Sequence, residues 1–209
     1  MTGPAKSQLL ALLKRKSVFH GDFVLSSGAH SKYYIDCRLT TFDAQGAWLV
    51  GQAMHDLIRG AERSLGARVA GVGGLTMGAD PIALAVGMIS FQQDASNPLK
   101  VFAVRKTQKA HGQTKLIEGN FSEGDEVVVI DDVITKGEST LKAIDAVVQA
   151  RGKIAFVAVL VDREEGGRQN IEARGYKVFS LFKKKELLDD SETGASQQIF
   201  GSAVGATSL

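Results

Sequence analysis

Two adjacent carboxylates, Asp131 and Asp132, directly follow the apolar run Val127 to Ile130 in the middle of the chain. An apolar run without alternation is typical of a strand buried on both faces of a parallel sheet. The next stretch, residues 135–139 (TKGES), leads into a helical pattern. Free N–H groups and the dipole at a helix N-terminus favour a phosphate there. Acids suited to hydroxyls or a hydrated cation, next to a phosphate loop, indicate a sugar phosphate as the ligand.

A second group of residues carries positive charge. The segment from Arg105 to Lys115 contains no acid, and its cationic and titratable side chains are Arg105, Lys106, Lys109, His111 and Lys115. One interpretation is a solvated basic loop, which is what most charge runs are. The other is a set of donors for a multiply charged leaving group such as pyrophosphate. Gly112 and Gly119 would let such a loop open and close over the site, excluding water.

The composition narrows the class of protein. The chain has 209 residues, 44% hydrophobic and 23% charged, which fits one α/β domain with a sizeable core. The net charge of +2 does not favour a nucleic-acid binder. No apolar run approaches the roughly 20 residues that cross a bilayer, and the N-terminal cations follow the apolar stretch, the reverse of a secretory signal. Cys37 is the single cysteine, so a disulfide framework is excluded. We expect a soluble, cytoplasmic protein with no nucleic-acid or membrane partner.

Hydrophobic periodicity predicts alternating strands and helices. Asp43 is a plausible N-cap for the longest helix. In the strand 32–38, alternation places Tyr34, Asp36 and Arg38 on one face. The expected helices span 6–16, 43–65, 82–89 and 138–150, and the expected strands span 18–25, 32–38, 67–72, 99–104, 126–130, 153–161 and 176–182.

This order predicts a mainly parallel sheet with helices on both faces. Ligands bind at the carboxyl ends of such strands, so the loops 73–80, 105–119, 131–140 and 162–168 should form one site. We expect a single domain over residues 1–190, with an N-terminal helix and hood hairpin (1–42) and an α/β core (43–185). Residues 191–209, rich in Gly, Ala, Ser and Thr, read as a loosely ordered tail.

Two nucleotide-binding motifs fail on particular residues. Gly73 and Gly78 have the spacing of a P-loop, but Ala79 and Asp80 stand where Lys and Ser or Thr are required. Gly71 and Gly73 begin a dinucleotide fingerprint, but Thr76 occupies the third glycine position. These glycines are better explained by tight turns and close backbone approach.

With the segment Ile130 to Thr140 in view, the chain resembles the type I phosphoribosyltransferases. Two further segments narrow the resemblance to the orotate phosphoribosyltransferases: Phe23 to Asp36 is similar to their N-terminal segment, and Val104 to Gly119 to their mobile catalytic loop. The resemblance covers about residues 5–185. It implies a glycosyltransferase of pyrimidine biosynthesis that forms orotidine 5′-monophosphate and pyrophosphate from orotate and phosphoribosyl pyrophosphate (PRPP) with Mg²⁺. It also implies a homodimer in which the catalytic loop acts across the interface.

The resemblance assigns roles residue by residue. Lys109, His111, Asp131 and Asp132 are the catalytic candidates, and the acids take the ribose hydroxyls and the hydration shell of Mg²⁺, with no direct protein ligand to the metal. The PRPP-binding candidates are Arg105, Lys106, Lys109, His111, Asp131, Asp132, Val133, Ile134, Thr135, Lys136, Gly137, Glu138 and Ser139. The orotate-binding candidates are Tyr34, Ile35, Thr135 and Arg163. A guanidinium suits a planar carboxylate, although an ion pair of Arg163 with Glu164 or Glu165 is an alternative.

Two positions depart from the family pattern. Many relatives carry a ligand-binding lysine at the position of Ser26, and some carry one at the position of Met77. His30 and Lys32 are candidates to replace the missing positive charge. Two rival functions stay open on the sequence: a phosphoribosyltransferase for another base, such as a purine, and a PRPP-sensing regulator that binds DNA. The second should add a DNA-binding module or a basic surface, and neither is visible in the sequence.

Overall fold

A six-stranded sheet in the order β5-β4-β3-β6-β7-β8 forms the centre of the computed structural model, which describes residues 4–24, 28, 30–107 and 115–189. Neighbouring strands are parallel except for β5, which pairs antiparallel with β4. The strands are β3 (Gly71–Leu75), β4 (Lys100–Val104), β5 (Ile117–Gly119), β6 (Glu126–Ile134), β7 (Lys153–Asp162) and β8 (Val178–Lys183). The predicted α/β class is confirmed.

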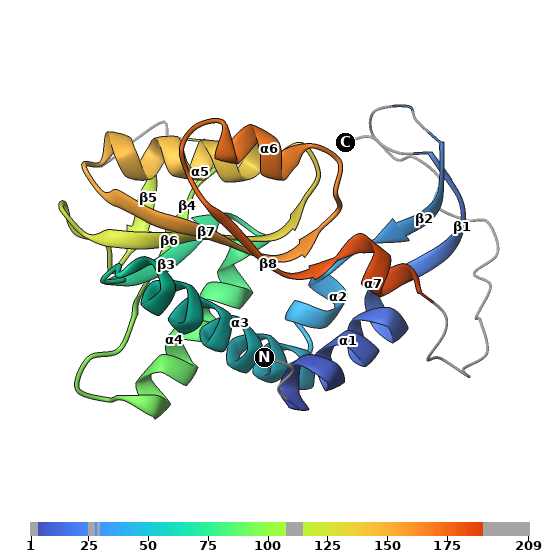
Figure 1. Ribbon diagram of the computed structural model, residues 1–209, viewed down its shortest axis with the longest axis horizontal. Coiled ribbons are helices and arrows are strands. Elements are labelled where there is room, and N and C mark those ends of the chain that lie inside the picture. The colour runs from blue at the N-terminus through green and yellow to red at the C-terminus, as the bar shows by residue number, and fades with distance from the viewer. Residues whose placement is uncertain (1–3, 25–27, 29, 108–114, 190–209) are drawn as a thin grey trace.

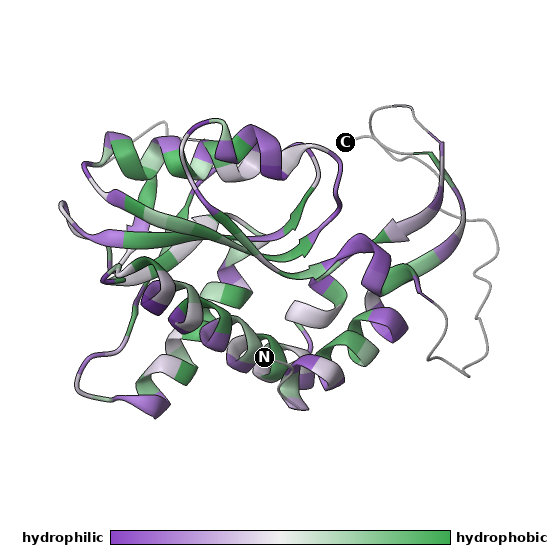
Figure 2. Cartoon of the chain, in the orientation of Figure 1, coloured by the Kyte–Doolittle hydropathy of each residue, from purple (hydrophilic) through white to green (hydrophobic). Residues whose placement is uncertain are grey.

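Helices cover both faces of this sheet (Figure 1). On one face lie α3 (Ala44–Leu65) and α4 (Ala79–Gln93), and on the other α5 (Glu138–Gln149) and α6 (Gly167–Glu172). Successive strand residues point to opposite faces, so Val128 and Ile130 join the core beneath α3 and α4, whereas Val127 and Val129 join the core beneath α5. Figure 2 shows hydrophobic residues running along the central strands. Strand β6 therefore contributes side chains to both cores. Burying each of these side chains stabilises the fold by about 1.5–3 kcal/mol.

Helix α3 has the capping that the sequence predicts. The Asp43 carboxylate accepts a hydrogen bond from the backbone N–H of Gly46 at 2.9 Å, and Gly66 ends the helix with a φ of 65°. The Lys16 ammonium group of α1 (Pro4–Ser17) also donates to the Asp43 carboxylate. These contacts tie the N-terminal helix to the core.

Strand β3 lies further along the chain than the predicted strand 67–72. Its residues Gly73 and Gly74 read as turn formers in the sequence, but both lie within the strand. A Cβ atom on Gly73 would come within 2.2 Å of the Phe102 carbonyl oxygen, and one on Gly74 within 2.0 Å of the Ile130 carbonyl oxygen. These glycines therefore permit close packing of the central strands. Strand β6 is also longer than predicted. Asp131 and Asp132 therefore lie within the strand, near its carboxyl end, and not in a loop.

A separate antiparallel hairpin of β1 (Val18–Val24) and β2 (His30–Ile35) forms the predicted hood, at one end of the molecule (Figure 1). The predicted strand 32–38 is wrong beyond Ile35, because the chain turns at Asp36 into the short helix α2 (Arg38–Thr41). Strand β5 and helices α6 and α7 (Lys184–Leu188) were not predicted from the sequence. No helix among the described residues is long and apolar enough to cross a membrane. The expected tail, 191–209, lies outside the described residues.

Candidate active site

A cavity of about 310 Å³ lies between the carboxyl ends of the central strands and the hood. Many of the predicted site residues meet there, as expected for loops that follow parallel strands. The predicted residues in its wall are Tyr34, Ile35, Lys106, Asp131, Asp132, Val133, Thr135, Ser139 and Arg163. Segments separated by more than a hundred residues in the sequence thus contribute to one site.

The two acids differ in burial and partners. Asp131 is 5% exposed, and its carboxylate accepts a hydrogen bond from the Thr140 hydroxyl at 2.7 Å and another from the Asp132 backbone N–H at 3.0 Å. The Asp132 carboxylate accepts from the Val133 N–H at 2.9 Å. Burial, followed by the charge of Asp132, raises the pKa of Asp131 to about 7, and burial also raises the pKa of Asp132. A cation or a set of hydroxyl donors at this position would favour the charged forms.

The segment after β6 turns closely against α6. Gly137 has a φ of 81°, and a Cβ atom there would lie 3.0 Å from the Gly167 carbonyl oxygen. Thr135 and Ser139 line the cavity at the N-terminus of α5, where unpaired backbone N–H groups favour an anion. This segment therefore lies beside the cavity at the carboxyl end of β6, and its binding of a phosphate stays a prediction.

Four other predicted residues of this loop do not present side chains to the cavity. Ile134 is 1% exposed and belongs to the core beneath α5. The Lys136 ammonium group donates to the Glu165 carbonyl oxygen at 2.9 Å, away from the cavity wall. Gly137 and Glu138 are also absent from the wall among the described residues. Any contact of these four with a phosphate would have to come from the backbone.

Arg163 lines the cavity from the end of β7 and is 9% exposed. Its Nη2 atom lies 3.0 Å from a Glu165 carboxylate oxygen and 3.3 Å from the Tyr33 hydroxyl oxygen. The guanidinium also lies 5.3 Å from the centre of the Tyr33 ring. The ion pair with Glu165, which the sequence left as an alternative, is therefore present, and it orients a guanidinium that still forms part of the wall.

Tyr34 and Ile35 bring the hood to the same cavity. The Tyr34 ring packs against Phe23 and Phe19, with ring centres 5.8 and 6.4 Å away, and is still 38% exposed. A partly exposed aromatic ring in the same cavity wall as an arginine suits a flat heterocycle carrying a carboxylate.

The predicted cations fall into three groups. Lys106 lines the cavity, whereas the Arg105 side chain does not and instead lies 3.3 Å from a Glu118 carboxylate oxygen. Lys109 and His111 lie outside the described residues, as does Ser26. Neither His30 nor Lys32 lines the cavity, and the Lys32 ammonium group donates to Asp22 on the exposed hairpin. Compensation by these two residues therefore stays a prediction that the described cavity wall does not support.

Several residues of the wall were not predicted as site residues: Asp36, Cys37, Arg38, Leu75, Thr76, Met77 and Gly78. Gly78 lies against the acid pair, since a Cβ atom there would come within 2.4 Å of an Asp132 carboxylate oxygen. Burial raises the pKa of the Cys37 thiol, which is therefore protonated and unreactive. A turn signal at Asp36, whose carboxylate accepts the Arg38 backbone N–H at 3.0 Å, would have indicated that the strand stops before Arg38.

Comparisons with known proteins agree with this geometry. The chain is 44% identical over 186 residues to an orotate phosphoribosyltransferase of Aquifex aeolicus, covering 88% of this chain and 97% of that protein. It is 38% identical over 187 residues to the enzyme of Mycobacterium tuberculosis, covering 90% and 98%. No protein-family model matches the chain.

Solved structures give the same result. The M. tuberculosis orotate phosphoribosyltransferase in complex with Fe(III) dicitrate superimposes with a TM-score of 0.76 at 37% identity, covering 88% of this chain and 99% of that one. The same enzyme in complex with PRPP gives 0.70 at 31% identity, covering 90% and 93%. An adenine phosphoribosyltransferase of Leishmania donovani gives 0.60 at 15% identity, which reflects the fold alone. The chain therefore belongs to the orotate phosphoribosyltransferase family, within the type I phosphoribosyltransferases.

Proposed function

We propose that the protein transfers the ribose 5-phosphate group of PRPP to orotate, giving orotidine 5′-monophosphate and pyrophosphate in pyrimidine biosynthesis. The observation that carries this proposal is the meeting of the acid pair, the phosphate loop, Lys106 and Arg163 in one cavity. The acid pair suits the ribose of PRPP, the phosphate loop its 5′-phosphate and Lys106 its diphosphate. Arg163 suits the carboxylate of orotate. Family membership supports the same reaction, and the metabolic role supports a cytoplasmic location.

In this reaction a ring nitrogen of orotate loses its proton, which passes to solvent or to the departing pyrophosphate, and forms a bond to C1 of the ribose. The bond from C1 to the pyrophosphate oxygen breaks, and its electron pair leaves with that oxygen. The ribose gains positive charge as that bond breaks, so Asp131 and Asp132 would hold the ring by its hydroxyls and offset the charge, as carboxylates do in glycoside hydrolysis. Thr135 and Ser139 would fix the 5′-phosphate. Holding both ends of the sugar orients C1 toward the base.

The departing pyrophosphate needs donors directed at its oxygens. Lys106 provides one from the cavity wall. We further propose that Lys109 and His111, which lie outside the described residues, bind the same group, as the family resemblance implies. Lys109→Ala should lower kcat by about 10²–10³, the scale for losing one preorganised donor. A kcat within twofold of the parent would remove Lys109 from this role.

Orotate would lie between the hood and the end of β7. The exposed face of Tyr34 offers stacking, and Arg163 can donate two parallel N–H groups to the orotate carboxylate. Glu165 and Tyr33 hold the guanidinium in place. This arrangement favours a carboxylated pyrimidine over a purine, because a purine has no carboxylate to accept the N–H groups that the buried guanidinium directs at the base.

Mg²⁺ fits the donors of this site. Two carboxylates are present, and the described residues contain no cluster of three potential metal ligands. Mg²⁺ prefers oxygen ligands, keeps several waters and is commonly held by one or two carboxylates plus substrate phosphates. When bound, the ion would neutralise the negative charge of the diphosphate. We propose that it rests on PRPP and water beside Asp131 and Asp132.

We also propose a homodimer. Helix α4 exposes Leu84, Met88 and Phe91, which are 58%, 62% and 58% exposed and share one helix face. They border an apolar groove with Pro98 and Leu99. Apolar groups gathered in this way are typical of association surfaces. Light scattering should give twice the chain mass, and Met88→Asp should shift it toward the monomer; a monomeric parent would contradict the proposal.

The direct test of the function is a spectrophotometric assay of orotate consumption with PRPP and Mg²⁺. Orotate should be consumed, and adenine, guanine, hypoxanthine and uracil should give no comparable rate. Turnover of another base without orotate turnover would establish the first rival function. PRPP binding without turnover of any base would support the regulator instead.

A further inference from the structure

The Asp36–Arg38 pair at the cavity wall has no role in the account so far. The Arg38 guanidinium donates from Nε and Nη2 to the two Asp36 carboxylate oxygens, each at 2.8 Å. The same carboxylate accepts the Arg38 backbone N–H, and the Asp36 N–H donates to the Ser17 carbonyl oxygen at 2.9 Å. Both residues line the cavity. The guanidinium is thus fixed in one orientation, which lowers the entropy lost when it binds a ligand.

This guanidinium keeps donors for a ligand. A guanidinium has five N–H groups, and Asp36 uses two of them, so the remainder are available at a side chain that is 49% exposed. The Asp36 side chain is only 17% exposed. Its carboxylate is bound by Arg38, and its backbone N–H donates to Ser17. Such a geometry is unlike a mobile surface ion pair, because the acid is built into the turn that begins α2.

The charges of the cavity wall favour such a donor. The wall carries the carboxylates of Asp36, Asp131 and Asp132, which repel a diphosphate. The cations in the described part of the wall are Arg38, Lys106 and Arg163, and Arg163 is already engaged by Glu165. Met77 supplies no charge from the β3 side. Within the described part of the wall, Arg38 and Lys106 are therefore the cations that could meet a diphosphate.

The position of Arg38 relates it to the acid pair. The charge of Arg38 acts on Asp132, and Gly78 of the β3 loop contacts the same acid. Lys106 follows β4, on the β3 side of β6, whereas Arg163 follows β7 on the opposite side. Arg38 interacts electrostatically with Tyr34 of the hood as well as with Asp132, so it lies between the hood and the acid pair.

We propose that Arg38, oriented by Asp36, is a substrate-binding residue that donates to the diphosphate group of PRPP. The inference rests on the proposed function for the identity of the substrate. The pairing also explains why an acid stands in the wall of a site for a polyanion: it orients the donor.

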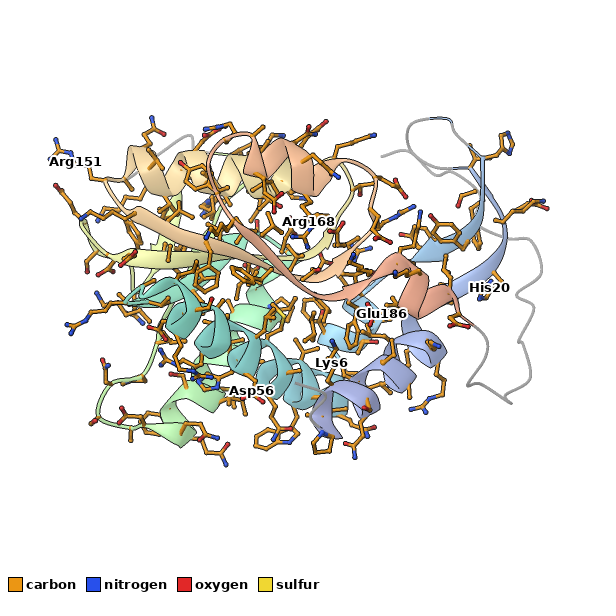
Figure 3. All side chains as sticks on the ribbon, in the orientation of Figure 1. Lys6, His20, Asp56, Arg151, Arg168 and Glu186 are labelled. Atoms are coloured by element: carbon orange, nitrogen blue, oxygen red, sulfur yellow. The ribbon has the colours of Figure 1, made fainter. Side chains whose placement is uncertain are left out.

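The test compares Arg38→Gln with a matched control, Arg151→Gln. Arg151 also forms an ion pair, with Glu123 at 3.0 Å, but it lies at the end of the molecule opposite the hood (Figure 3). Calorimetric titration with inorganic pyrophosphate should show binding weakened about tenfold or more in Arg38→Gln, the scale for one charge-assisted hydrogen bond. The KM for PRPP should rise similarly, with the KM for orotate within twofold. The control should match the parent.

Two results would overturn the proposal: pyrophosphate affinity within twofold of the parent, or a KM for orotate that rises as much as the KM for PRPP. If Arg38→Gln does not fold, Arg38→Lys is judged by the same criteria, because lysine cannot reproduce the paired geometry. Asp36→Asn keeps the guanidinium and should weaken pyrophosphate binding less than Arg38→Gln; parental affinity there would remove the orienting role. Absence of orotate turnover in the parent would refute the function, while the pyrophosphate titration still decides the role of Arg38.

Discussion

The acidic floor of the cavity, Asp131 and Asp132, and its cationic rim, Arg38, Lys106 and Arg163, are built in opposite ways. The floor comes from consecutive residues near the carboxyl end of the central strand β6, fixed by short backbone and hydroxyl contacts. The rim comes from three distant segments, each cation at the edge of its own loop or strand. A rigid floor suits the ribose, which must be held at a defined angle. A rim from separate segments suits a leaving group that must enter and depart.

The floor should tolerate change least. Asp132→Asn keeps the size of the side chain but removes the charge that we propose faces the ribose. We expect kcat/KM for PRPP to fall about 10²-fold, the scale for losing the positioning of a reacting group. Steady-state kinetics with thermal melting as a folding control would measure this. A fall of less than threefold in a folded variant would mean that the floor does not hold the ribose.

The position of the floor can be disturbed without touching an acid. Gly78→Ala places a methyl group within 2.4 Å of the Asp132 carboxylate in its present position, so the acid must move. We expect kcat/KM to fall about tenfold. Gly60→Ala is the matched control, because a Cβ atom there meets nothing within 4 Å, and alanine in a helix should stabilise slightly. Equal activity of the two variants would show that the contact with Gly78 does not position Asp132.

The rim should respond more weakly to loss of a supporting contact. Glu165→Gln removes the charge that holds Arg163, whose side chain is 11% exposed beside a Glu165 that is 28% exposed. We expect the KM for orotate to rise by less than about tenfold, since one hydrogen bond to a charged group is at stake. The KM for PRPP should stay within twofold. A larger effect on PRPP than on orotate would place Arg163 near the other substrate.

The smallest effect concerns stability and its dependence on pH. In the folded protein without substrates, Asp131 keeps its proton up to about pH 7, whereas in the unfolded chain it releases it near its ordinary pKa of 3.8. The folded state therefore binds more protons between these values, and stability should fall as pH rises from about 4 to about 7.

Asp131→Asn has no proton to release at this position. The melting temperature of the parent relative to Asp131→Asn should therefore decrease by a few degrees from pH 5 to pH 8, since about 1 kcal/mol shifts melting by roughly 2–4 °C in a chain of this size. Calorimetry or circular dichroism without PRPP and Mg²⁺ would measure it. A constant difference across this range would show that Asp131 is ionised throughout.

The same contrast explains which residues of the cavity could be predicted from the sequence. The floor was predictable because its strand, acids and phosphate loop are consecutive residues, and each leaves a local pattern in the sequence. Lys106 and Arg163 followed from the rule that strand ends meet at one edge of a sheet. Arg38 did not, because the strand pattern was extended past Ile35, where the Asp36 side chain redirects the backbone into α2.

Strand β3 was misplaced for a related reason. Gly73 and Gly74 have no side chains to show hydrophobic periodicity, and paired glycines usually indicate a turn. Their real constraint is the approach of Phe102 and Ile130 from neighbouring strands. Such a constraint depends on residues about 30 and 55 positions away, and so no local pattern contains it. The side chains of the hood that reach the cavity depend on the tertiary structure in the same way.

In this proposal the floor holds the ribose, and Arg38 and Lys106 of the rim hold the diphosphate. The most direct measurement is a crossed calorimetric titration of Asp132→Asn and Lys106→Gln with ribose 5-phosphate and, separately, with pyrophosphate in the absence of Mg²⁺. We expect Asp132→Asn to lose affinity for ribose 5-phosphate and to bind pyrophosphate at least as well as the parent. Lys106→Gln should lose affinity for pyrophosphate and bind ribose 5-phosphate as well as the parent. Equal losses for both ligands in both variants would contradict the division of the site.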